Sequence, residues 1–145
     1  MFDPKDRVLS IKVDHQLSNR NDGQGRHWAI SNKAKSKLLR NVREAEVFGT
    51  DDKLCKLGLT FEFKVDILVT RVLGANQRLW DADSVLRGDC KQLIDSIVSL
   101  GILKDDGPKY VGHVLGTQEQ FRRKRGPCVW VDFFKSDTPP TSELR

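Results

Sequence analysis

The stretch LGLTFEFKVDILV, residues 57–69, decides the fold, because an apolar side chain stands at every second position. The apolar members are Leu57, Leu59, Phe61, Phe63, Val65, Ile67 and Val69. Side chains of a strand point alternately to its two faces, so a period of two is typical of a strand. The pattern predicts one long strand over residues 57–69 with one apolar and one polar face.

The segments on either side predict further strands and two helices. Shorter alternations predict strands over residues 8–13, 110–116 and 129–133. Apolar residues recur every three or four positions over residues 34–48 and 86–100, which is typical of helices. Ser31 is the expected N-cap of the first helix and Gly49 its end, whereas Gly101 ends the second. The order β-α-β-α-β-β predicts an α+β fold, one mixed sheet with two helices packed on it.

The length of 145 residues predicts a single domain over residues 1–134. Residues 135–145 contain Pro139-Pro140 and no apolar pattern, so we expect a disordered tail. No apolar run approaches the roughly 18 residues of a membrane-spanning helix, and residues 1–6 have no signal-peptide pattern. The three cysteines Cys55, Cys90 and Cys128 are too scattered for a disulfide framework or a zinc site. A cytoplasmic location with reduced thiols is therefore expected.

Two acidic groups flank the second predicted helix. Asp81 and Asp83 precede it, Asp95 lies within it, and Asp105-Asp106 follows it. Residues i and i+2 of an extended chain point to the same side, so Asp81 and Asp83 can share a cation. Carboxylate oxygens are the ligands that Mg²⁺ prefers. On spacing alone, a solvated helix start and a polar turn are the simpler interpretations of the two groups.

Basic residues surround these acids, although the net charge is only +5 from 25 Lys and Arg against 20 Asp and Glu. The candidates for contacts with a phosphate backbone are Arg20, Arg26, Lys33, Lys37, Arg40, Arg71, Arg78, Arg122, Arg123, Lys124 and Arg125. Positive charge beside acidic groups suits an enzyme that grips a nucleic acid and delivers a metal to one phosphodiester. A basic surface without the acids would suit a simple nucleic-acid binder.

Three segments together resemble the signature of RusA-type Holliday junction resolvases. They are WDADS at residues 80–84, KQLID at 91–95 and LGILKDD at 100–106. The segment from Arg26 to Arg43 also resembles that family, and the likeness spans residues 8–134. The resemblance implies a homodimeric, Mg²⁺-dependent endonuclease that resolves four-way DNA junctions by paired nicks in DNA recombination and repair. Mn²⁺ is expected to substitute for Mg²⁺, no nucleotide cofactor is expected, and such proteins are common in phages and prophages.

The same resemblance assigns residues to the site. Its metal-binding acids correspond to Asp81, Asp83 and Asp106, with Asp95 and Asp105 as additional candidates. Its essential lysine corresponds to Lys91 by the Lys-x-x-x-Asp spacing, or to Arg87 by the distance from the acidic pair. Ser84 stands where many members have Asn, so the role of that side chain does not carry over.

The two acidic groups present a geometric problem. A helix over residues 84–100 would be about 25 Å long, so acids at its two ends cannot share a metal directly. Either residues 102–106 fold back along the helix, or a dimer partner supplies its own acids.

Two other functions remain open from the sequence. Glu62-Phe63-Lys64, with Asp51 or Asp52 upstream, matches the Glu-x-Lys core of restriction-endonuclease-like nucleases. Alternatively, the chain is a non-catalytic DNA-binding accessory protein of recombination, whose acids only solvate a surface. Trp80, next to Asp81, is expected to pack against the protein rather than stack on a base.

Overall fold

The computed structural model describes residues 2–17, 28–49, 61, 63–80, 84–86, 90–121 and 126–136. Over these residues the element order is η1 (Pro4–Asp6), β1 (Arg7–Val13), α1 (Trp28–Arg43), β2 (Glu46–Gly49), β3 (Val65–Val72), η2 (Ser84–Leu86), α2 (Cys90–Ser99), β4 (Val111–Glu119) and β5 (Cys128–Lys135). The strands form one five-stranded sheet in the order β2-β1-β5-β3-β4. Only the β3–β4 pair is parallel, so the sheet is mixed.

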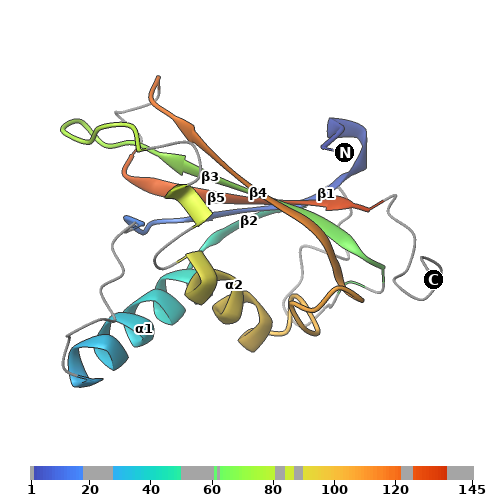
Figure 1. Cartoon of the computed structure of the whole chain (residues 1–145), viewed down its shortest axis with the longest axis horizontal. Helices are drawn as coiled ribbons and strands as arrows, with labels where there is room; N and C mark the ends of the chain where they lie inside the picture. Colours follow the sequence, from blue (N-terminus) through green and yellow to red (C-terminus); the bar gives the residue numbers. More distant parts are fainter. Residues whose placement is uncertain are drawn as a thin grey trace.

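The α+β class with two helices on one mixed sheet is confirmed. Figure 1 shows α1 and α2 on the same side of the sheet. Apolar side chains of the strands and of both helices form one buried core, which includes Ile11, Leu38, Val69, Leu93 and Ile97. Among the described residues, no helix is long and apolar enough to cross a membrane.

The predicted first helix was too long, because its last residues form a strand. The helix α1 ends at Arg43, and β2 pairs with β1 so that Val47 lies opposite Ile11 and Phe48 opposite Ser10. The ring of Phe48 lies 5.6 Å from that of Trp130 on β5. Phe48 continued the helical spacing by coincidence, since it lies on β2, and Ala45 lies between the end of α1 and this strand.

The long predicted strand also lies elsewhere. The strand β3 runs from Val65 to Val72, and Phe61 and Phe63 lie before it; residues 57–60 and 62 are outside the described residues. Nearly every residue of β3 is buried, because β5 and β4 flank it on both sides. The solvated polar face that the alternation predicts is therefore absent from β3, where Asp66 and Arg71 are buried.

The second helix is shorter than predicted. A 3-10 turn, η2, precedes it, and α2 covers only Cys90–Ser99. Gly101 ends it as predicted, with a φ of 84°. The amide of Gly101 bonds to the Val98 carbonyl at 3.0 Å, and that of Ile102 to the Ile97 carbonyl at 3.3 Å. These two bonds form a Schellman motif, which reverses the chain direction.

Candidate functional site

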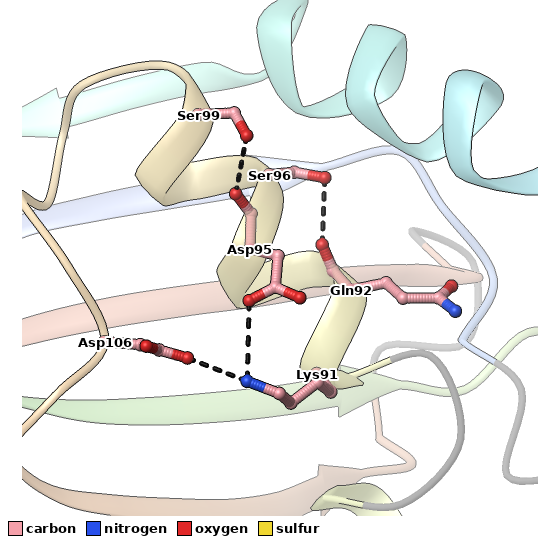
Figure 2. Close-up of polar contacts among 6 residues, drawn as sticks. All are labelled: Lys91, Gln92, Asp95, Ser96, Ser99 and Asp106. Carbon is pink, nitrogen blue, oxygen red and sulfur yellow. Dashed lines mark hydrogen bonds and ion pairs between the residues drawn. The ribbon is translucent and has the colours of Figure 1, made fainter.

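Lys91, in the first turn of α2, connects two of the candidate acids (Figure 2). Its Nζ donates a hydrogen bond to Asp106 Oδ2 at 2.8 Å and lies 3.6 Å from Asp95 Oδ1. The pair with Asp95 follows from the i,i+4 spacing on one helix face. The bond with Asp106 joins residues fifteen positions apart, so it depends on how the chain returns from the end of α2.

That return follows the first of the two predicted routes, in which residues 102–106 fold back along the helix. After the reversal at Gly101, the carbonyl of Ile102 accepts a hydrogen bond from the Phe61 amide at 3.4 Å. The side chain of Leu103 is buried in the core. A turn closed by the Tyr110 amide on the Gly107 carbonyl then leads into β4. Two anchored residues thus direct Asp106 toward the beginning of α2.

The cluster of Lys91, Asp95 and Asp106 is open to solvent, with side chains that are 71%, 55% and 34% exposed. The hydrogen bond from Lys91 lowers the pKa of the Asp106 carboxyl, and the same bond raises the pKa of Lys91. Asp106 is therefore a carboxylate at neutral pH. Its oxygens are the donor type that fits Mg²⁺. Asp95 contacts the same Lys91 Nζ, and Asp105 is the preceding residue in the chain.

The described part of the chain does not by itself contain a complete metal site. No three His, Cys, Asp or Glu side chains within it converge on one point. Asp81 and Asp83, which the family resemblance assigns to the same metal as Asp106, lie outside the described residues. The same holds for the other candidates Arg20, Arg26, Arg87, Arg122, Arg123, Lys124 and Arg125.

The basic face predicted on the first helix is present on α1. Lys33, Lys37 and Arg40 are all exposed and follow the i, i+4, i+7 spacing that places residues on one stripe. They lie opposite the buried Leu38 and Val42, so the stripe faces away from the core. Arg78, in the loop after β3, is also exposed.

Arg71 is the exception among the predicted DNA contacts, because it is only 3% exposed. Its guanidinium donates to the side chain of Gln118 at 2.8 Å and to the backbone carbonyl of Arg78 at 3.0 Å. It also lies 3.6 Å from the centre of the Trp80 ring. The prediction that Arg71 contacts DNA is wrong, because the guanidinium is enclosed in these contacts, whereas the prediction that Trp80 packs against the protein is confirmed.

Sequence reasoning missed Gln118 on β4. Its carboxamide accepts a hydrogen bond from the Trp80 amide at 2.8 Å and donates one to the Trp80 carbonyl at 3.0 Å. A glutamine near the end of an edge strand gives no signal in the sequence. Its importance appears only from the parallel register, in which Arg71 of β3 lies opposite Gln118 of β4.

A cavity of about 210 Å³ lies between the two helices, beside the cluster. Its lining residues are Lys35, Leu39, Gln92, Asp95, Ser96 and Ser99. The hydroxyls of Ser96 and Ser99 donate to the carbonyls of Gln92 and Asp95, one helical turn earlier (Figure 2). The cavity is thus lined both by Asp95 of the cluster and by Lys35 of α1.

The second nuclease hypothesis involves residues that the structure mostly does not describe. Glu62, Asp51 and Asp52 lie outside the described residues. Lys64 lies immediately before β3, where its carbonyl accepts a hydrogen bond from the Ser136 amide at 2.9 Å.

In comparisons with known proteins, no family model matches the chain and no curated protein matches it.

Proposed function

We propose that the chain is a Mg²⁺-dependent endonuclease that resolves four-way DNA junctions by paired nicks. The observation that carries this proposal is the bond between Lys91 and Asp106. The resemblance to RusA-type resolvases assigns both residues to one active site, although they are fifteen positions apart. Their contact is what an active site built from the segments KQLID and LGILKDD requires.

The roles of the side chains follow from their chemistry. Asp106 would hold Mg²⁺ together with Asp81 and Asp83, and the bound ion would activate a water and stabilise charge on the scissile phosphate. Lys91 has three N–H donors. The short bond to Asp106 uses one of them, and the side chain is largely exposed. A remaining donor is available to a phosphate oxygen and would stabilise its developing negative charge.

The basic stripe on α1 provides the binding surface for DNA in this proposal. Lys33, Lys37 and Arg40 would neutralise backbone phosphates and release counterions, which favours binding at low salt. The helix α1 also borders the cavity that contains Asp95, but it does so through Lys35 and Leu39, on the side of the helix opposite the stripe. A junction with two-fold symmetry needs two matched cuts, so we expect a homodimer with one site per subunit.

Cleavage of a synthetic four-way junction, compared with a linear duplex of the same sequence, tests the proposal. We expect nicks in opposite strands of the junction when Mg²⁺ or Mn²⁺ is present, and none in EDTA. Junction binding in EDTA without any nicks on adding metal would instead identify a non-catalytic DNA-binding protein. Equal cleavage of the duplex would remove the junction as the specific substrate.

A matched pair of variants tests the site. Asp106→Asn removes the negative charge that Lys91 contacts and is expected to reduce cleavage about 100-fold or more, since even residues beyond the metal ligands matter 10- to 100-fold. Asp105→Asn, at the neighbouring position, should cost much less, while both variants keep junction binding in EDTA. Loss of cleavage on substituting Glu62, with Asp106→Asn still active, would favour the restriction-endonuclease-like alternative.

A further inference from the structure

The strand β4 is a long edge strand with one unpaired side. The sheet order β2-β1-β5-β3-β4 leaves β4 paired with β3 alone in the described part of the chain. The strand at the other edge, β2, spans only four residues, whereas β4 spans nine. Folded proteins usually shorten an edge strand or give it lysine or proline, because a long edge pairs readily with another chain. Between Val111 and Glu119 there is neither lysine nor proline, so this edge is open to pairing.

The unpaired side of β4 presents the backbone groups of three residues. The Leu73 amide donates to the Glu119 carbonyl at 3.0 Å, which shows that Glu119 faces β3. Alternate residues of a strand bond to the same neighbour, so Val114, Gly116 and Gln118 turn their amides and carbonyls away from β3. These groups form no backbone hydrogen bond with any described residue. They therefore stand in one row of donors and acceptors along the edge.

Exposed apolar side chains flank this row on both faces of the sheet. Leu86 of η2 is 39% exposed, and its Cγ lies 3.1 Å from the position that a Cβ on Gly116 would take. Leu115 is 50% exposed and, as the neighbouring strand residue, points to the opposite face. A strand added beside Gly116 would therefore cover apolar surface on both faces, in addition to forming its hydrogen bonds.

A second copy of β4 in antiparallel orientation fits this edge when the two Gly116 residues lie opposite each other. Val114 of each copy then lies opposite Gln118 of the other, so all three outward-facing residues are paired. A shift by two residues in either direction would leave one of them opposite a residue outside 114–118. Each such pair exchanges an amide and a carbonyl bond, which gives about six hydrogen bonds across the interface.

The side chains on the face of the sheet without helices also suit this register. Leu115 would lie opposite Thr117 of the second copy. The side chain of His113, which is 44% exposed, would lie opposite Glu119 of the second copy. An imidazole and a carboxylate form a favourable cross-strand pair, whereas like charges directly opposite would repel. The edge is therefore complementary to itself in charge as well as in hydrogen bonding.

We propose that the chain forms a homodimer in which two β4 strands pair antiparallel across a two-fold axis through Gly116. The homodimer is an expectation of the proposed function, on which this inference rests. An axis that relates antiparallel edge strands is perpendicular to the sheet, so it keeps α1 and α2 of both copies on one side of the joined sheet (Figure 1). The two Lys91–Asp106 clusters would be related by the same axis, as two matched cuts in a symmetric junction require.

Analytical ultracentrifugation of the wild type and of paired charge variants tests the interface. Leu115→Lys/Thr117→Lys brings two pairs of like charges face to face in the proposed register, and Leu115→Glu/Thr117→Glu does the same with negative charge. We expect each to raise the dimer dissociation constant about tenfold or more, whereas an equimolar mixture of the two should form a heterodimer. Val47→Lys is the matched control, because Val47 is 38% exposed on β2, at the opposite edge, and should leave the constant unchanged.

Hydrogen exchange of backbone amides gives a second readout that needs no variant. The amides of Val114, Gly116 and Gln118 should exchange slowly in the concentrated wild type and much faster on dilution below the dissociation constant. The amide of Leu115, which faces β3, should stay slow at both concentrations. This pattern distinguishes pairing through β4 from a dimer formed elsewhere.

A wild type that is monomeric at all concentrations would overturn the inference, and so would a dimer in which the three outward-facing amides exchange fast. A monomer whose three amides become slow only when an extended peptide is added would show that β4 takes a different partner, which also overturns it. A dimer formed through β4 that cleaves no junction in Mg²⁺ would overturn the proposed function alone.

Discussion

Gly101 is the residue on which the return of the chain toward Lys91 depends, and Gly101→Ala tests this directly. Its φ of 84° lies in the left-handed region, and a Cβ added there would meet no atom within 4 Å. The substitution therefore introduces no clash, and its whole cost comes from the backbone conformation. That cost is about 1–2 kcal/mol for a residue other than glycine. For a chain of 145 residues, this corresponds to a melting temperature lower by roughly 2–8 °C.

Urea unfolding and thermal melting of the wild type, Gly101→Ala and Gly101→Asn measure this cost. Asparagine adopts the left-handed conformation more readily than alanine, so its loss should be smaller. An unchanged slope of free energy against urea would show that the native state keeps its compactness. If Gly101→Ala is as stable as the wild type, or if asparagine costs more than alanine, the Schellman motif is not what ends α2.

Two further predictions concern charge. Lys91→Met should raise the pKa of Asp106 toward the usual value of about 3.9, which a carboxyl ¹³C NMR titration measures. Because its pKa is lowered on folding, ionised Asp106 stabilises the folded state above the unfolded pKa, and this stabilisation is lost as pH falls through the folded pKa. The pH dependence of stability that Lys91→Met removes therefore lies on the acid side. An unmoved titration of Asp106 would contradict this prediction. Replacing Lys33, Lys37 and Arg40 with Gln should weaken junction binding in EDTA and reduce the slope of log K against log salt by about 3. An unchanged slope would place the DNA elsewhere.

The sequence predicted those strands in which the alternation of apolar and polar residues follows from packing on the core on one face. The strand over residues 8–13 and that over residues 129–133 were found because their buried apolar side chains alternate along the sequence. The strand β2 was missed because Phe48, which lies on it, also continues the helical spacing of the apolar residues before it. The strand β3 was placed too early, since alternation in the preceding segment continues into it without a break and a single sequence does not show where pairing starts.

For the candidate site, the sequence brought Lys91 and Asp106 into one hypothesis but left two routes open for their approach. Choosing between the routes required the Schellman motif at Gly101 and the burial of Leu103, which depend on tertiary packing. The role of Arg71 was predicted wrongly because charge alone suggests a solvated surface. Its burial depends on the register of β3 against β4, which places Gln118 beside it and which no spacing along the chain reveals.

Because the chain folds back after α2, the length of this helix determines the distance between Lys91 and Asp106. From Lys91 to Gly101 the helix rises about 15 Å at 1.5 Å per residue. The five residues from Ile102 to Asp106 reach at most about 17 Å when fully extended. The two lengths are similar, so one extra helical turn between Lys91 and Gly101 would move Lys91 about 5.4 Å farther from the chain reversal and weaken its contact with Asp106. Extra residues before Cys90 leave this distance unchanged, so the contact between Lys91 and Asp106 depends on the length of the chain on one side of Lys91 and not on the other.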